Sequence, residues 1–135
     1  MIIESLLCIA LNIYFEARSE DLQGKVAVGS VVMNRIAHER FPDSACEVVY
    51  QAEYHSGTLV RHRCQFSWFC DGLSDNPYEK EEWALAVTLA IWIYDIGLPD
   101  ITNGALWYHS NDVSPKWATT NYIQIGSHKF YKEVN

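Results

Sequence analysis

Apolar residues recur at three- and four-residue steps in the first part of the chain, a spacing typical of helices with one buried face. The first stripe predicts a helix from Glu4 to Ala17 and comprises Leu6, Ala10, Ile13 and Ala17, widened by Leu7 and Tyr14. Asp21 can cap a second helix, because Asp accepts backbone N–H bonds at a helix start. The expected face of that helix contains Val26, Gly29, Met33 and Ala37.

The pattern then changes several times. Pro42 is expected to end the second helix, and Asp43 or Ser44 to open a short third one. Residues 53–77 mix turn-forming and aromatic residues without a sustained period, so an irregular segment is expected. A further helix is predicted from about Tyr78 to Ile96, with a stripe of Trp83, Val87, Ala90, Ile91 and Tyr94 and with Gly97 as the C-cap.

Short strands are predicted beyond Pro99, at residues 105–109 and 122–125, and a turn at Ser127-His128 leads into residues 129–132. The pattern as a whole predicts an α+β, mostly helical fold with a small antiparallel β element near the C-terminus. A chain of 135 residues suffices for one domain, which we expect to span residues 1–135.

The composition and charge of the chain argue against several classes of function. The chain has 17 acidic and 10 basic residues and a formal charge of −7, which argues against a general nucleic-acid binder. The longest nearly apolar run, Ala84 to Tyr94, is shorter than the ~20 residues of a membrane-spanning helix, so no membrane insertion is expected. Glu4 stands where a secretory signal carries Lys or Arg, so we expect no signal peptide.

The cysteines and histidines predict no metal site. Four cysteines are too few to define a disulfide scaffold, and we expect Cys8, Cys46, Cys64 and Cys70 to be buried as small apolar residues. A bridge from Cys46 to Cys64 or Cys70 is the alternative. The histidine spacings match no zinc motif, so neither a metal nor another cofactor is expected.

Glu16 is the candidate general acid. It lies at the C-terminal end of the first predicted helix, where desolvation and the negative end of the helix dipole both raise a carboxyl pKa. A carboxylic acid that stays protonated near neutrality can give a proton to a departing sugar oxygen. The alternative is an ion pair of Glu16 with Arg18 or Arg35, and position alone favours that pair.

Aromatic clusters offer candidate sugar contacts. Residues 64–68 read Cys-Gln-Phe-Ser-Trp, a mixture that suits either sugar binding or a local hydrophobic plug. Trp107-Tyr108-His109 forms a second cluster, in which strand alternation places Tyr108 opposite its two neighbours. A triad of Ser67, His109 and Asp71 lacks the turn motif of serine hydrolases.

A series of motifs in fixed order adds a family resemblance. The chain resembles the spore cortex-lytic and cell wall hydrolase family of the SleB and CwlJ type in Ile13–Glu20, Gly24–Val28, Val31–Arg35, Phe41-Pro42, Val48–Gln51, Cys64–Trp68, Asp71-Gly72, Gly104–His109, Pro115–Trp117 and Ile125–Tyr131. The resemblance covers essentially the whole chain. Ser19 departs from it, because the family usually has Gly there.

This resemblance implies a lysozyme-like fold, related to lytic transglycosylases and resuscitation-promoting factors. It also implies cleavage of peptidoglycan between MurNAc and GlcNAc, with Glu16 as the catalytic acid, and thereby overturns the ion-pair preference. Substrate contacts are expected from residues of the aromatic clusters, namely Gln65, Phe66, Ser67, Trp68, Tyr108, His109, His128 and Tyr131.

The sequence nominates no clear second carboxylate, since the break near Ser19 turns Glu20 elsewhere. A single carboxylate suffices for lytic transglycosylation, which leaves 1,6-anhydro-MurNAc ends. The alternatives are a non-catalytic wall-binding module and an amidase, which usually needs zinc. We expect a monomer that acts on the wall after release, as a phage lysin or virion-associated enzyme, or in the spore coat or cortex.

Overall fold

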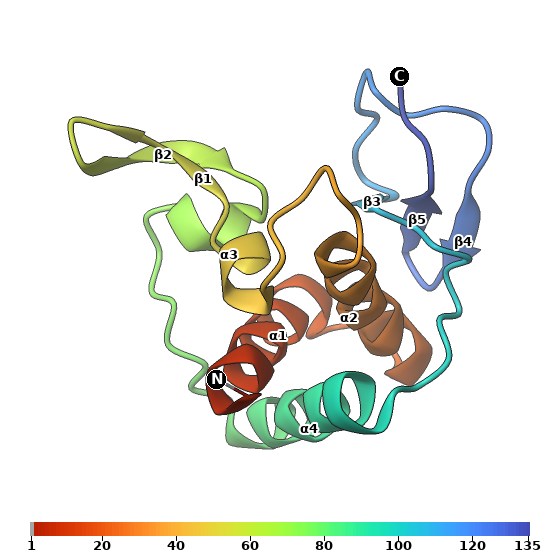
Figure 1. Cartoon of the computed structure of the whole chain (residues 1–135), viewed down its shortest axis with the longest axis horizontal. Coiled ribbons are helices and arrows are strands. Elements are labelled where there is room, and N and C mark those ends of the chain that lie inside the picture. Colours follow the sequence, from red (N-terminus) through yellow and green to blue (C-terminus); the bar gives the residue numbers. More distant parts are fainter. Residues whose placement is uncertain (1) are drawn as a thin grey trace.

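The computed structural model describes residues 2–135, and a bundle of helices forms its centre. Helix α1 (Ile2–Ala17) packs against α2 (Leu22–Ile36), α3 (Ala45–Val49) and α4 (Lys80–Ile91) (Figure 1). A π-helical turn, Trp92–Ile96, extends α4 to Gly97, whose left-handed backbone (φ +85°) ends it. The end of α1 therefore lies in the middle of the molecule, where other elements surround it.

The predicted starts of α2 and α3 are confirmed, whereas α1 begins at Ile2 and α4 at Lys80, each two residues from the predicted start. The Asp21 side chain accepts the Gly24 N–H at 3.0 Å and caps α2, and Ser44 accepts the Glu47 N–H at 3.3 Å and caps α3. The end of α2 was placed too late, because the helix stops at Ile36 and the chain turns before it reaches Pro42.

The predicted stripe of the last helix is confirmed in part, because Ala90 is buried and Trp83, Val87 and Tyr94 are half-buried against the main core. The side chains that α4 and its extension bury are Ala86, Leu89, Ala90 and Ile93, whereas Ile91 is exposed. Apolar residues occur on nearly every side of this segment, so the sequence pattern does not select a face. The contact with α1 selects it instead.

The expected irregular segment contains a hairpin. Strand β1 (Ala52–His55) pairs with β2 (Thr58–Cys64) in antiparallel register, and a 3₁₀ turn, Ser67–Cys70, follows. Ser56 and Gly57 both have positive φ, as the tight turn between such strands requires. Nearly all residues of both strands are exposed or half-buried, so the alternation that marks a strand with one buried face is missing.

The small antiparallel sheet near the C-terminus is confirmed. It contains β3 (Trp107–Ser110), β4 (Ile123–Ile125) and β5 (His128–Tyr131) in the order β3-β5-β4. The register pairs Tyr108 with Phe130. Figure 1 shows the hairpin and this sheet on opposite sides of the loop that follows α2, so two β lobes flank the helices. The fold is α+β and mostly helical, as predicted.

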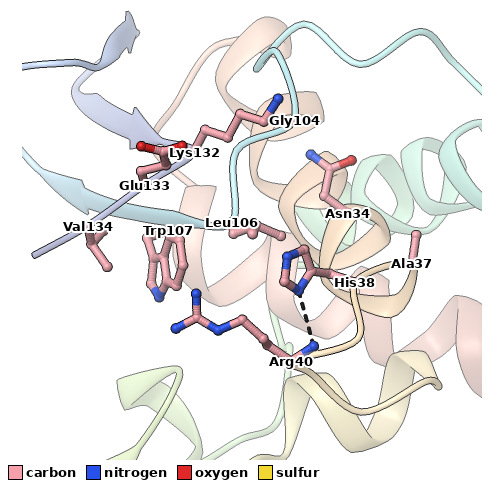
Figure 2. Close-up of a pocket in the computed structure, with 10 residues that line it drawn as sticks. All are labelled: Asn34, Ala37, His38, Arg40, Gly104, Leu106, Trp107, Lys132, Glu133 and Val134. Carbon is pink, nitrogen blue, oxygen red and sulfur yellow. Dashed lines mark hydrogen bonds between the residues drawn. The ribbon is translucent and has the colours of Figure 1, made fainter.

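A cavity of about 570 Å³ lies where the C-terminal end of α2 meets the C-terminal sheet (Figure 2). Its walls come from residues 34–40, residues 104–107 and residues 132–134. No helix within residues 2–135 has the length and apolar character needed to cross a membrane.

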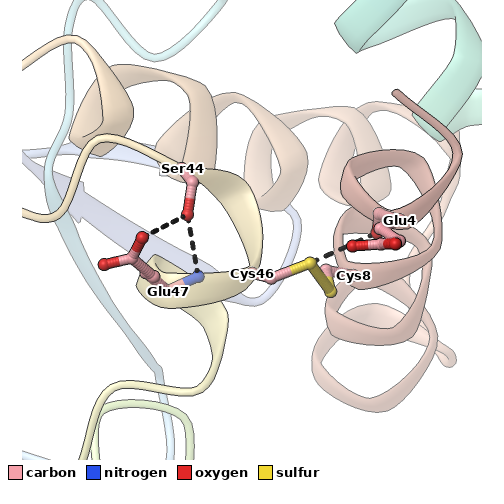
Figure 3. The surroundings of a disulfide bond; sticks show 5 residues. All are labelled: Glu4, Cys8, Ser44, Cys46 and Glu47. Carbon is pink, nitrogen blue, oxygen red and sulfur yellow. Dashed lines mark hydrogen bonds between the residues drawn. A yellow bond between two sulfur atoms is a disulfide. The ribbon is translucent and has the colours of Figure 1, made fainter. Parts of the chain in front are cut away.

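Two disulfides correct the cysteine prediction. Cys8 bonds to Cys46, which joins α1 to α3 (Figure 3), and Cys64 bonds to Cys70, which joins β2 to the 3₁₀ turn. All four cysteines are therefore paired, and neither bridge is the one considered from the sequence. The pairing follows from packing, since α3 lies on α1 with the Cys8 and Cys46 Cα atoms 5.2 Å apart.

Candidate active site

Glu16 occupies the last turn of α1 and is half-buried. Its Oε1 accepts a hydrogen bond of 2.6 Å from the Tyr108 hydroxyl of β3. Burial raises the pKa of Glu16 above its ordinary value, and this effect exceeds the opposing influences of the Tyr108 hydrogen bond and of the nearby charges of His128 and Arg35. Glu16 is thus a partly accessible carboxylic acid that holds its proton to a higher pH than an ordinary glutamate does.

The two arginines considered as ion-pair partners of Glu16 are engaged elsewhere. Arg18 donates to the Tyr14 hydroxyl at 2.8 Å and pairs with Glu79 at 3.1 Å. Arg35 donates to the Leu106 carbonyl at 2.7 Å and to the Gln65 side chain at 3.1 Å. Within residues 2–135 no salt bridge reaches Glu16, so the ion-pair alternative is wrong.

Arg35 is the cation beside the acid. Its guanidinium lies 4.7 Å from the Phe41 ring centroid and 5.1 Å from that of Phe66. Burial lowers the pKa of Arg35 to about 10, against the opposing influence of Tyr108 and Glu16. Arg35 remains charged at neutral pH and joins the hairpin side of the site, through Gln65, to the β3 side, through Leu106.

The end of α1 is fixed by a buried lysine. The Lys25 ammonium donates to the carbonyls of Ala17, Arg18 and Glu20 at 3.0, 2.9 and 2.6 Å. The last carbonyls of a helix have no partner within it, so Lys25 supplies the missing donors directly after Glu16.

Tyr108 is held by aromatic packing. Its ring contacts Phe66, His128 and Phe130, with centroid distances of 6.2, 5.5 and 5.4 Å. Burial, the charge of Glu16 and the hydrogen bond to it raise the pKa of Tyr108 well above 10. The phenol is therefore a neutral donor that fixes the orientation of the Glu16 carboxyl group.

Asn12 lies one helical turn before Glu16 and is fully buried. Its Oδ1 accepts the Trp68 indole N–H at 2.8 Å, while its Nδ2 has no hydrogen-bond partner among residues 2–135. Phe15 stacks on Trp68 with centroids 4.9 Å apart. These contacts with Trp68 fix the position of the last turns of α1, which carry Glu16.

His128 packs against Tyr108 and is also paired with a second carboxylate, Glu20. The Glu20 Oε1 lies 3.0 Å from His128 Nδ1, and Ser127 donates to Glu20 from its backbone and from its side chain. Although partial burial acts to raise it, the pKa of Glu20 is lowered by the hydrogen bonds from Ser127 and His128. Glu20 thus stays ionised and anchors the turn between β4 and β5, a contact that the sequence did not predict.

The structure separates the predicted substrate contacts into two groups. Tyr108 and His128 lie around Glu16, Gln65 reaches the site through Arg35, and Gln65 and Ser67 are exposed. The remaining four predicted contacts make no contact with Glu16 and are buried, as His128 also is; they are Phe66, Trp68, His109 and Tyr131.

The side chains of this second group pack inside the protein, and their role as substrate contacts stays a prediction. Phe66 and Trp68 belong to the main hydrophobic core, beneath the site. His109 bonds the Tyr131 hydroxyl at 2.7 Å and the Ser110 carbonyl at 2.7 Å, and both rings pack on Trp117. With both ring nitrogens engaged, His109 also cannot serve the triad with Ser67 and Asp71. The predicted alternation of Tyr108 against His109 is confirmed.

Three residues of the site were missed or misjudged from the sequence, namely Asn12, Lys25 and Arg35. Each is a polar residue inside a strongly apolar helix, which is the signal that identifies them. Within residues 2–135 no three His, Cys, Asp or Glu side chains are grouped so that they could share a metal ion.

The fold and this site define a mostly helical α+β domain that presents one carboxylic acid with a raised pKa at the end of a central helix. The chain belongs to the Cell Wall Hydrolase family, whose sequence model matches residues 19–131. The matched segment begins just after Glu16, so the assignment of the acid rests on the geometry above.

Similar proteins agree with this family. The spore cortex-lytic enzymes of Oceanobacillus iheyensis and Bacillus subtilis are 28% and 26% identical over 89% and 90% of this chain. The chain spans only 38% and 35% of their lengths. The crystal structure of the catalytic domain of the Bacillus cereus SleB protein is 28% identical, with a TM-score of 0.60 over 93% of this chain and 88% of that one.

Proposed function

We propose that this chain is an enzyme that cleaves the glycan strands of peptidoglycan between MurNAc and GlcNAc, with Glu16 as the catalytic acid. The observation that carries the proposal is the partly accessible Glu16 carboxyl, whose pKa is raised by burial and which Tyr108 holds at 2.6 Å. Membership of the Cell Wall Hydrolase family supports the choice of substrate.

We further propose that the reaction is lytic transglycosylation. A retaining glycosidase needs a second carboxylate ~5 Å from the acid, and an inverting one needs it ~6.5–9.5 Å away. The charges of His128 and Arg35 both lower the pKa of Glu16, and the Glu20 carboxylate is engaged by Ser127 and His128. A mechanism with one carboxylate agrees with this environment.

In this mechanism Glu16 works twice. Its proton moves to the glycosidic oxygen, the bond to the muramoyl C1 breaks, and the GlcNAc-ended fragment leaves with a free hydroxyl. The Glu16 carboxylate then takes the proton of the muramoyl C6 hydroxyl, whose oxygen bonds to C1 and closes the 1,6-anhydro ring. Glu16 is protonated again at the end, and no water is consumed.

The residues around Glu16 have separate tasks in this scheme. The Tyr108 hydroxyl orients the carboxyl group before transfer and donates to the carboxylate afterwards. The charge of Arg35 stabilises the carboxylate between the two steps. Exposed Gln65 and Ser67, on the hairpin side, are the proposed sugar contacts.

Digestion of purified peptidoglycan tests the proposal. We expect fragments with the mass of anhydro ends. Products heavier by one water would show that the reaction is hydrolysis and not transglycosylation.

The variant Glu16→Gln tests the acid, because it keeps the shape of the side chain without the proton. It is expected to lower the rate by at least about 10³-fold. Glu81→Gln, an exposed carboxylate on α4, is the matched control and should retain activity. Retained activity in Glu16→Gln would refute the role of the acid.

The same digest separates the two rival functions. An amidase would release new amino termini rather than glycan ends, and its activity would fall in a chelator. A wall-binding module would sediment with peptidoglycan and release nothing. Action on the bacterial wall or the spore cortex is part of the proposal, and a phage or spore setting stays a prediction.

A further inference from the structure

The cavity of about 570 Å³ between α2 and the C-terminal sheet is a second recognition site by its composition. Two cationic side chains, Arg40 and Lys132, reach it from opposite sides, and Trp107 lies between them (Figure 2). The Arg40 guanidinium lies 5.6 Å from the centroid of the Trp107 ring. In a chain with a formal charge of −7, two cations around one aromatic surface form a local anion site.

These cations are not neutralised by the protein. Among residues 2–135 neither Arg40 nor Lys132 forms a salt bridge. The nearby Asp100 carboxylate accepts hydrogen bonds from Thr102, Gly104 and Asn34. These bonds lower the pKa of Asp100, although burial acts to raise it. Its charge is therefore engaged locally, and Glu133 is the acidic residue that lines the cavity itself.

Neutral polar groups complete the cavity. His38 Nδ1 accepts the Arg40 backbone N–H at 3.1 Å, so in the neutral ring Nε2 carries the hydrogen and is a donor. The Asn34 amide nitrogen donates to Asp100 and to the Ala105 carbonyl, which fixes the amide orientation. The Asn34 Oδ1 has no hydrogen-bond partner among residues 2–135 and is a free acceptor. The cavity thus offers donors for carboxylates, one acceptor for an amide N–H and an indole ring for aliphatic groups.

The cavity lies directly behind the candidate active site. Trp107 and Tyr108 are neighbours in β3, and strand alternation directs Trp107 to the cavity and Tyr108 to Glu16. Arg35 ties the two regions together, because it donates to the carbonyl of Leu106, which also lines the cavity. Because β3 is an edge strand of its sheet, a group attached to a sugar in the Glu16 site can reach the cavity by passing around that edge.

We infer that this cavity binds the acidic stem peptide carried by a muramic acid residue of the bound strand. The inference rests on the proposed function and names a recognition element of its substrate. The peptide carboxylates bind Arg40 and Lys132, a peptide N–H binds Asn34 Oδ1, and aliphatic side chains lie on Trp107. An extended peptide gains about 3.5 Å per residue, so three residues span about 10 Å, which lets the peptide pass around the edge strand β3 to its other face.

Direct binding is tested with a synthetic L-Ala-γ-D-Glu-L-Lys-D-Ala peptide, titrated into the full chain by NMR. We expect the indole signal of Trp107 and the amide signals of Asn34 to shift in the wild type. The double variant Arg40→Gln/Lys132→Gln should bind about tenfold more weakly, since it loses two charge contacts. Lys80→Gln/Lys116→Gln makes the same charge change at exposed sites outside the cavity and should bind as the wild type does.

Cleavage rates test the attached peptide. We expect strands with peptides to be cut at least about fivefold faster at low concentration than strands stripped of them, and this ratio should fall to near one in Arg40→Gln/Lys132→Gln. Equal rates for both strands in the wild type would overturn the inference, and so would peptide binding that the double variant leaves unchanged. If the peptide shifts Trp107 but no strand is cut, the cavity assignment stands and the proposed function fails.

Discussion

Tyr108 defines the chemistry of the site at the scale of single residues. A carboxyl group at a helix end is an ordinary feature, and it becomes a directed acid because one phenol, itself locked among aromatic rings, holds one of its oxygens. The hydrogen bond lowers the pKa of Glu16, while burial raises it by more. The hydrogen bond from Tyr108 therefore fixes the orientation of the Glu16 carboxyl group and at the same time reduces the rise in its pKa.

Removing the Tyr108 hydroxyl moves the pH profile in a definite direction. Activity requires protonated Glu16, so the rate falls as pH rises through the pKa of that group. Tyr108→Phe removes an influence that lowers this pKa, and the alkaline limb of kcat/KM should shift to higher pH while kcat drops by roughly 10–100-fold. A rate-against-pH series on purified peptidoglycan measures both effects. A shift of that limb to lower pH would contradict the assignment.

At the scale of elements, the site depends on how α1 ends. Its final turn is held by Lys25 of α2 and by the Glu20 contact with the β4–β5 turn, and the disulfide from Cys8 to α3 holds the helix about two turns earlier. Three separate elements thus fix the backbone on either side of Glu16. A helix end with this support presents its carboxyl group without a mobile loop.

Replacing Lys25 should loosen this end. Lys25→Met keeps the length of the side chain but leaves the carbonyls of Ala17, Arg18 and Glu20 without their donor. We expect a loss of about 2–4 kcal/mol in the free energy of unfolding, measured by urea denaturation, and a lower kcat in the folded fraction. Lys80→Met, at the exposed start of α4, is the control. Equal stability of Lys25→Met and the wild type would show that the three bonds do not support α1.

At the scale of the whole molecule, local signals predicted more than long-range ones. The caps at Asp21 and Ser44 and the alternation at Tyr108 follow from neighbours in sequence, and they were predicted. The raised pKa of Glu16 was predicted as well, although the burial that causes it depends on the packing of distant segments. The disulfides and the three carbonyl bonds of Lys25 join segments whose meeting depends on helix packing. The β1–β2 hairpin was missed because it buries neither face fully.

The net charge gives a prediction for the whole molecule. A chain of formal charge −7 is repelled at long range by an anionic wall, and salt screens this repulsion. Raising NaCl from about 10 to 150 mM should therefore raise the initial rate on intact anionic walls by about twofold, with little change on neutral glycan fragments. A steep loss of activity on walls over the same range would mean that attraction by charge dominates binding.

The most direct test of the central claim is the titration of the Glu16 carboxyl carbon by ¹³C NMR, assigned by comparison with Glu16→Gln. We predict a midpoint clearly above 4.5, the ordinary value for a glutamate, that coincides with the alkaline limb of the activity profile. A midpoint at or below 4.5 would mean that Glu16 is ionised at neutral pH, and it could not then be the proton donor.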